Sequence, residues 1–191
     1  MGSLLERLRG AMDPLGIVHD APPGSRRTAA VLLLFDSTHD GLPLLFIERT
    51  AHLRHHAGQI GFPGGGTEAQ DPTIVATAVR EAGEEAGVPA DAVEVIGVLP
   101  PFMTATSDNW LTPVVGIQNR DIELRPDPFE VARLFRLDLT ALMAAPHTVH
   151  TLTHEGLSRE VHFYDVDGNV VWGVTAAIVN ELIGRIESTA G

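Results

Sequence analysis

The sequence of 191 residues contains no cysteine, which excludes disulfide bonds, zinc–thiolate sites and cysteine nucleophiles. Basic residues are also scarce, since 13 stand against 25 acidic residues and leave a formal net charge of -12. Non-specific binding to nucleic acid depends on positive charge that contacts phosphates, so we do not expect this class of function. A small polyanionic substrate remains compatible with the charge, provided that metal ions and a few arginines reverse the field locally.

Long apolar runs are absent as well. The longest run, Ala29 to Phe35, has the length of a strand and is too short to cross a bilayer. The N-terminal segment MGSLLERLRGAMD lacks the apolar core of a signal peptide, and Glu6 stands where a myristoylation signal carries serine or threonine. These absences favour a soluble cytoplasmic protein without a membrane partner.

The composition is otherwise that of a globular protein, with 44% hydrophobic and 20% charged residues. The length favours one domain, which we expect at residues 28–191 after an N-terminal helix and connection in residues 1–27. Periodicity predicts helices at 4–12, 71–86, 138–144 and 173–186, and strands at 28–35, 44–48, 93–99, 110–118, 130–137, 148–153 and 160–166. This order predicts an α/β (α+β) fold with helices on two faces of a mixed sheet.

Residues 62–88 are the most informative stretch, because a glycine loop there precedes a helix. The three glycines at 64–66 allow the backbone to approach a ligand or a metal closely. Asp71 is expected to cap the helix, Pro72 suits its first position, and Gly87 ends it. The local pattern thus defines both the helix and the loop in front of it.

One face of this helix carries three carboxylates, Glu81, Glu84 and Glu85, within one turn. Like charges at this spacing destabilise a helix by roughly 0.2–0.5 kcal/mol per pair, and Arg80 offsets only part of this. A divalent cation would convert the repulsion into affinity, because hard cations favour oxygen ligands. We therefore predict a metal site, with a solvated and salt-bridged helix face as the competing interpretation.

Residues 66–88 resemble the Nudix box, G-x5-E-x7-R-E-U-x-E-E-x-G-U, where U is aliphatic. Gly66 occupies the first position, and residues 80–88 (REAGEEAGV) fill the second half. The first glutamate of the pattern falls on Pro72, which has no side-chain oxygen. Asp71 and Glu68 are the neighbouring carboxylates that could replace it.

A second motif lies just upstream of the glycine loop. Arg49, Arg54, Gly58 and the FPGG of residues 62–65 follow the spacing R-[SA]-x3-R-x3-G-x3-F-P-G-G, with Thr50 in place of serine or alanine. This resembles the coenzyme A pyrophosphatase branch of the Nudix hydrolases. Guanidinium groups bind phosphate oxygens in a bidentate manner. The resemblance implies substrate contacts from Arg49, Arg54, Gly58, Phe62, Gly64 and Gly65.

The resemblance also implies a fold and a reaction. The fold would be a Nudix-type α/β/α sandwich with a mixed central sheet. The reaction would be hydrolysis of the diphosphate bond of coenzyme A or its derivatives, giving adenosine 3',5'-bisphosphate and phosphopantetheine, with Mg2+ or Mn2+ bound by Glu81, Glu84 and Glu85. Glu130 matches a place where Nudix proteins often carry a further glutamate. Either Glu81 or Glu130 would take the proton from the attacking water.

Alternatives remain open at this point. Another nucleoside diphosphate derivative, such as ADP-ribose or NADH, could be the substrate, and a non-catalytic Nudix module that binds nucleotide is a different class of function. The spacing of His147, His150 and His154 could suggest a metal, but a solvated strand face is the favoured interpretation. Besides the small-molecule substrate, a second copy of the chain could bind and form a homodimer.

Overall fold

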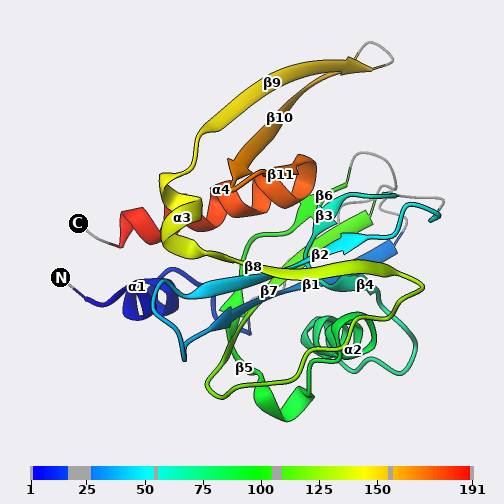
Figure 1. Cartoon of the computed structure of the whole chain (residues 1–191), viewed down its shortest axis with the longest axis vertical. Coiled ribbons are helices and arrows are strands. Elements are labelled where there is room, and N and C mark those ends of the chain that lie inside the picture. Colours follow the sequence, from blue (N-terminus) through cyan, green and yellow to red (C-terminus); the bar gives the residue numbers. More distant parts are fainter. Residues whose placement is uncertain (1, 17–26, 54–55, 105–108, 155–156, 190–191) are drawn as a thin grey trace.

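The computed structural model describes residues 2–16, 27–53, 56–104, 109–154 and 157–189 (Figure 1). The helices are α1 (Leu4–Gly10), α2 (Ile74–Ala86), α3 (Leu139–Ala144) and α4 (Gly173–Ser188), with a short 3-10 helix at Ala90–Ala92. The strands are β1 (Arg27–Asp36), β2 (Pro43–Arg49), β3 (Ile60–Gly61), β4 (Gly64–Gly66), β5 (Glu94–Val98), β6 (Phe102–Met103), β7 (Asn109–Gln118), β8 (Val131–Asp138), β9 (His147–His154), β10 (Leu157–Val166) and β11 (Asn169–Trp172).

The larger sheet is mixed, and its strands run in the order β3-β2-β1-β7-β5. Strands β1 and β7 are parallel over their whole lengths, whereas β1 pairs with β2 and β4 in the antiparallel sense. Strand β6 pairs with β7, and β8 pairs with β2. The β8 and β4 pairings bring the residues near 49, 64 and 131 to one end of the sheet.

The apolar run of β1 serves two cores. Its residues Ala30, Leu32 and Leu34 belong to the cluster that packs against α2, while Leu33 and Phe35 belong to the cluster that includes α4. Successive side chains of a strand point to opposite faces, so a continuous apolar run fits a strand covered on both sides. Figure 1 shows α2 on one side of the sheet and α4 on the other, which confirms the predicted sandwich with a mixed sheet.

Two local predictions around α2 are wrong. The helix begins at Ile74, and Thr73 caps it by accepting a hydrogen bond from the Ala76 N–H, so Asp71 and Pro72 lie before the helix. Threonine satisfies a free N–H at that place as aspartate would, which the sequence pattern alone does not distinguish. The glycine loop also differs, because residues 64–66 form β4 and pair with β1. The predicted end of the helix at Gly87 is confirmed, with φ of 68°.

A smaller sheet of strands β11-β10-β9 stands beside α4. Its β9–β10 hairpin extends away from the body of the molecule (Figure 1). At the N-terminus, Leu8 of α1 is fully buried in the same core as α4. Across the residues that the structure describes, no helix is long and apolar enough to cross a membrane.

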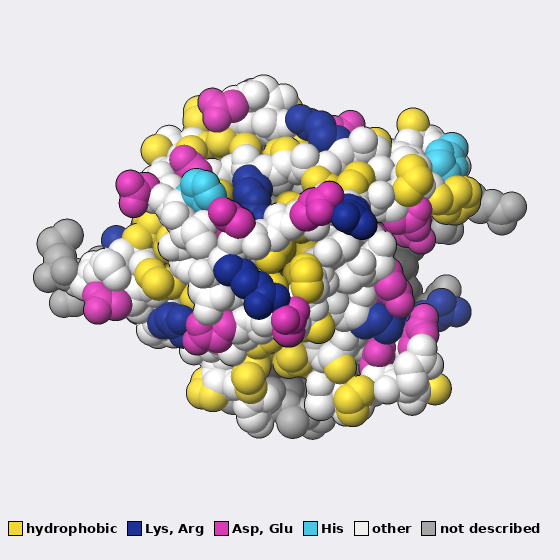
Figure 2. Space-filling view, turned by 60° about the horizontal axis from the view of Figure 1, so that its bottom comes forward, with side chains coloured by type: hydrophobic (Ala, Val, Ile, Leu, Met, Phe, Trp, Pro, Cys, Tyr) yellow, Lys and Arg dark blue, Asp and Glu magenta, His cyan; other side chains and the backbone are white. Residues whose placement is uncertain are grey.

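Charge is interspersed on the face shown in Figure 2, where acidic side chains lie beside basic ones and apolar atoms lie between them. The sequence contains no lysine, so the basic side chains are all arginines. Guanidinium groups hold carboxylates bidentately, and several such pairs are present. Carboxylates and arginines thus balance each other locally, and the net charge of -12 is the excess of carboxylates over the whole chain.

Candidate active site

Helix α2 presents its glutamates because its opposite side is made of alanine. Ala78, Ala82 and Ala86 are fully buried against the sheet, and their small side chains let the helix lie close to β1. Glu81 and Glu85 then project over the edge of this contact toward β4, while Glu84 faces outward, its side chain 59% exposed. The three glutamates thus lie in three different environments, although the sequence places them within one turn.

Glu85 is the buried carboxylate of the site, with a side chain only 4% exposed. Its Oε2 accepts a hydrogen bond from the Gly64 N–H at 2.9 Å, and its Oε1 accepts one from Arg49 Nη1 at 2.9 Å. Burial raises the pKa of Glu85 to about 7, because these two donors compensate only partly for lost hydration. Its negative charge is therefore under-stabilised by the protein alone.

Glu81 lies over the glycine strand. A Cβ built on Gly65 would come within 2.7 Å of the Glu81 Oε2, so only glycine leaves room for this carboxylate. Burial is also the main cause that raises the pKa of Glu81, with Arg80 opposing the shift. Gly64 is more strictly constrained, since a Cβ there would lie 2.6 Å from the Val31 Cα, a backbone atom that cannot move aside as the Glu81 side chain can. The glycines serve close packing of β4 between β1 and the glutamates.

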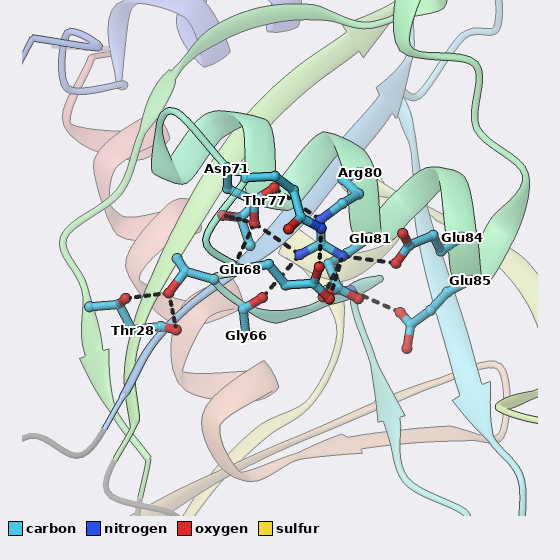
Figure 3. A network of polar contacts seen from close by, with 12 residues as sticks. Thr28, Gly66, Glu68, Asp71, Thr77, Arg80, Glu81, Glu84 and Glu85 are labelled. Atoms are coloured by element: carbon cyan, nitrogen blue, oxygen red, sulfur yellow. Dashed lines mark hydrogen bonds and ion pairs between the residues drawn. The ribbon is translucent and has the colours of Figure 1, made fainter.

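Arg80 contacts the acidic side chains that lie near Gly66 and Asp71 (Figure 3). Its guanidinium donates to both Asp71 carboxylate oxygens at 3.0 Å, to Glu84 at 2.8 Å and to the Gly66 carbonyl at 3.0 Å. It also forms an ion pair with Glu81 at 3.1 Å. Arg80 therefore pairs with two glutamates of its own helix, Glu81 and Glu84.

Asp71 supplies the carboxylate that Pro72 lacks. Besides binding Arg80, it accepts hydrogen bonds from the Thr77 hydroxyl and the Glu68 N–H. Arg80 and these donors hold the pKa of Asp71 well below its usual range. Glu68, the other candidate, lies 3.8 Å from the Arg80 Nη1 and is the weaker partner. Of the two carboxylates that could replace the box glutamate, Asp71 is thus the one in closer contact with Arg80.

Arg49 and Glu130 approach α2 from the neighbouring strands. Arg49 ends β2, and its Nη2 donates to Glu130 at 3.2 Å while its Nη1 donates to Glu85. The Thr50 N–H bonds the Glu130 carbonyl, and the Thr50 hydroxyl bonds the Phe129 carbonyl, which fixes Glu130 beside β2. The structure therefore brings Arg49, Glu130 and Glu85 together, although they are far apart in the sequence.

The other residues of the upstream motif differ in where they lie in the structure. Gly58, with φ of 67°, donates its N–H to the Arg49 carbonyl and closes the chain after β2. Phe62 is buried, with its ring centroid 4.9 Å from that of Phe46. Arg54, the second predicted phosphate ligand, lies outside the described residues. The predicted substrate contacts of this motif stay predictions.

A pocket of about 270 Å³ opens next to the glycine strand. Arg49, Phe62 and the three glycines line one side of it. Its other lining residues are Ala29, Val31, His56, Gln59, Ile60, Gly61, Thr104, Asn109, Leu111, Val174, Thr175 and Ile178. His56, Gln59, Ile60 and Gly61 stand at unspecified positions of the upstream motif, and the other eight come from distant parts of the chain. His56, with φ of 58°, and Gly173 at the start of α4, with φ of 67°, have a left-handed backbone at this wall.

The carboxylates suit a hard divalent cation, since Mg2+ and Mn2+ prefer oxygen ligands. Across the described residues, no three acidic or histidine side chains gather into a group that could hold a metal ion as they stand. Arg49 and Arg80 lie between them instead. The buried Glu85 nevertheless fits a cation, because added positive charge would stabilise its ionised form.

Comparisons of the sequence and of the structure with known proteins point to the same family. The NUDIX domain model matches residues 24–155. A protein of Shigella flexneri named "Uncharacterized Nudix hydrolase NudL" is 40% identical over 169 residues, covering 87% of this chain and 86% of that protein. A protein of the same name from Photorhabdus laumondii is 37% identical over 145 residues, covering 75% of this chain and 77% of that protein.

Solved structures with a similar fold carry related titles. The Nudix hydrolase RenU from M. smegmatis superposes with a TM-score of 0.51 at 25% identity, covering 69% of this chain and 78% of that one. A MutT protein from Methanosarcina mazei superposes with a TM-score of 0.55 at 13% identity, covering 86% and 94%. At that low identity the second match speaks for the fold alone.

Proposed function

Since the chain belongs to the Nudix hydrolase family, we propose that it hydrolyses the diphosphate bond of coenzyme A or a coenzyme A derivative. The products would be adenosine 3',5'-bisphosphate and phosphopantetheine. The reaction class follows from the family, and the substrate follows from the motif that runs from Arg49 through Gly58 to the FPGG of residues 62–65.

Glu85 is the single observation that carries the hydrolase proposal. A carboxylate buried to this extent with a pKa near 7 is ionised only in part at neutral pH, and further positive charge would favour its anion. If Glu85 had only a structural role, a neutral residue of similar shape would stabilise the fold better, because a buried charge with too few compensating partners opposes folding. Such perturbed groups are typical of functional sites.

The metal ligands would be Glu81, Glu84 and Glu85, with Mg2+ or Mn2+ as the cation. When bound, such a cation supplies neutralisation of the diphosphate and a lower pKa for a coordinated water. Arg80 holds Glu81 and Glu84 in place from one side, and the Gly64 N–H holds Glu85 from the other. Because Arg49 and Arg80 now lie between the carboxylates, metal binding would require these arginines or the glutamates to move.

Arg49 would bind a substrate phosphate. Its guanidinium now bonds Glu85 and Glu130 at the edge of the pocket, and a diphosphate entering there would compete for the same donors. Charge-assisted, bidentate hydrogen bonds to phosphate are favourable enough for such an exchange. Glu130 would then be released from Arg49 and become available as a proton acceptor.

Glu81 and Glu130 remain the two candidates for the general base. Burial raises the pKa of Glu81, and a base works best when its pKa lies near the working pH, which favours Glu81. Glu130 has the more open position, with a side chain 41% exposed. Comparing Glu81→Gln with Glu130→Gln at saturating Mn2+, with the Mn2+ affinity measured beside kcat, distinguishes them, because loss of the base lowers kcat at unchanged metal and substrate affinity.

The proposal is tested by incubating the protein with coenzyme A, ADP-ribose and NADH, each with Mg2+, Mn2+ or EDTA, and separating the products. We expect metal-dependent cleavage with the highest kcat/KM on coenzyme A, and its loss in Glu85→Gln. Higher kcat/KM on ADP-ribose or NADH would overturn the substrate assignment and leave the reaction class. Binding of a nucleotide without any turnover would instead show a non-catalytic module.

A further inference from the structure

Strand β9 lies at an exposed edge of the small sheet, and few contacts within one chain stabilise it. Among the described residues it pairs with β10 alone, and every side chain from His147 to Thr153 is exposed. The hairpin reaches beyond the body of the molecule (Figure 1), so its outer part has no sheet or helix beneath it. A two-stranded hairpin is marginally stable at best in water without such support.

The β9 edge also lacks the features that protect exposed strands. Proteins usually blunt such edges with lysine, proline, a bulge or a short strand. The sequence of β9, HTVHTLTH, spans eight residues, contains no charged residue or proline, and pairs with β10 in continuous register. Its unpaired N–H and C=O groups are therefore open to another strand.

Apolar side chains flank this edge on both faces of the hairpin. Val149 is 45% exposed on one face, and Leu152 is 51% exposed on the other. On the Leu152 face, the ring of His150 meets that of Phe163 edge-on at 5.1 Å, and Phe163 stacks on Trp172. An apolar strip thus runs across the small sheet and ends at β9 without cover.

We propose that β9 pairs with β9 of a second copy of the chain, in the antiparallel sense about a twofold axis, so that the two small sheets become one continuous sheet. Two identical edge strands can pair in the antiparallel sense about a twofold axis. Each outward N–H of one strand then meets an outward C=O of the other, and symmetry repeats the same bond in reverse. The inference does not depend on the proposed enzymatic function.

The lack of acidic and basic side chains on β9 argues against a charged partner and leaves a second β9 strand as the matching surface. Each copy carries a net charge of -12, so two bodies repel if they approach through their acidic surfaces. The uncharged β9 lies on a projecting arm and lets two copies join while their bodies stay apart. A basic protein, by contrast, would find no carboxylate on β9 to recognise.

The side chains also suggest a register. If Thr151 lies on the twofold axis, it faces its own copy, and His150 faces Leu152 of the copy on the same side of the sheet. The alternative axis at His150 sets two imidazoles directly opposite each other. Threonine pairs and apolar neighbours stabilise antiparallel sheets, and the axis at Thr151 provides both, so we assign the axis to Thr151.

The absence of cysteine allows a direct test, because any introduced thiol is unique in the chain. The first measurement is the mass of the wild-type protein by sedimentation equilibrium, where we expect a species of twice the 20.4 kDa chain mass at micromolar concentration. Under mild oxidation, Thr151→Cys is expected to give a disulfide-linked dimer. Val170→Cys, on the opposite edge strand β11 and 48% exposed, is the matched control and should remain mostly unlinked.

A second pair of variants tests the edge without a cross-link. Leu152→Lys should weaken dimerisation at least tenfold, because it places two ammonium groups near the axis, while Val170→Lys should leave it unchanged. Both variants should keep the wild-type far-UV circular dichroism and diphosphate hydrolysis. A wild-type protein that stays monomeric, or a dimer that Leu152→Lys and Val170→Lys affect equally, would overturn the proposal.

Discussion

At the scale of single residues, the candidate site separates three glutamates that the sequence presents as equals. Glu85 is buried and bonded to Gly64, Glu81 packs over Gly65, and Glu84 is exposed beside Arg80. A carboxylate with few compensating donors becomes harder to ionise, whereas an exposed one keeps its hydration. The three therefore respond differently to pH and to substitution.

Asp71→Ala tests whether Asp71 replaces the missing box glutamate. Loss of its bidentate contact frees Arg80, which then no longer orients Glu81 and Glu84, and a misplacement of this kind costs about 10- to 100-fold in kcat. The measurement is kcat and KM with coenzyme A, together with the Mn2+ dissociation constant by titration calorimetry. The expected pattern is lower kcat and weaker Mn2+ binding.

The double variant Asp71→Ala/Pro72→Glu is the matched control, because it restores a carboxylate at the place where the box pattern has one. We expect it to recover most of the kcat and of the Mn2+ affinity. If Asp71→Ala alone retains the wild-type values of both, Asp71 has no positioning role.

Glu85 makes the stability of the metal-free protein depend on pH. Its pKa rises from 4.5 in the unfolded chain to about 7 in the folded one, so the folded state binds more protons between these values. The free energy of unfolding should therefore fall as pH rises from about 4.5 to above 7, by about 3 kcal/mol for this group. Denaturant unfolding in EDTA at several pH values measures this dependence.

Glu85→Gln is the control for that titration, because the amide does not ionise. In EDTA its free energy of unfolding should change less with pH than that of the wild type over the same range. Added Mg2+ should stabilise the wild type more at pH 8 than at pH 5, since a carboxylate must lose its proton to bind a metal. An equal pH dependence in the two proteins would contradict the assignment.

At the scale of secondary-structure elements, β4 connects the sheet to α2. It pairs with β1 through residues 64–66, and the Gly64 N–H reaches Glu85 on α2. The strand is thus held by two neighbours, and its backbone position sets that of a functional carboxylate. A change in β4 should affect stability and activity together.

Gly64→Ala and Gly66→Ala form a matched pair within β4. A Cβ on Gly64 would meet the Val31 Cα at 2.6 Å, whereas one on Gly66 has no neighbour within 4 Å. We expect Gly64→Ala to lower the free energy of unfolding by about 1–3 kcal/mol and kcat at least tenfold, while Gly66→Ala leaves the stability within about 0.5 kcal/mol of the wild type. Chemical denaturation and the coenzyme A assay measure both effects, and equal behaviour would refute this packing argument.

At the scale of the whole molecule, the N-terminal helix belongs to the body of the fold. Leu8 is fully buried, Arg7 donates to the Ile186 carbonyl, and Arg185 bonds Asp13. These contacts join α1 and the residues after it to α4 across the length of the chain. The expected division of the chain at residue 27 stays a prediction, and the contacts argue that α1 and Asp13 contribute to stability.

Leu8→Ala measures that contribution. Removing a fully buried leucine side chain costs about 2–5 kcal/mol, so the free energy of unfolding should fall by this amount. Leu15→Ala, at an exposed leucine, should change it by less than about 0.5 kcal/mol. Thermal and denaturant unfolding of both variants decide whether α1 is integral, and a loss below 1 kcal/mol for Leu8→Ala would indicate a dispensable helix.

Much of the fold was predictable because it rests on local patterns. The β1 run of apolar residues, the spacing on α2 and the glycine after it each depend on neighbours within a few residues. The start of α2 was wrong by three residues, because Asp71 and Thr73 are both suitable caps. Asp71 was needed elsewhere, on Arg80, and only the folded chain shows that competition.

The sequence by itself determined the family, the helix with its acidic face, and the arginines and glycines that precede it, because each is a short pattern of residue types at set spacing. Only the tertiary structure decided which groups meet. Arg49 bonds Glu85 and Glu130 across 36 and 81 residues, Thr175 closes the pocket from the far end of the chain, and β9 is left at an edge. Such contacts depend on strand order and on burial, which set the distances and the pKa values that residue spacing leaves open.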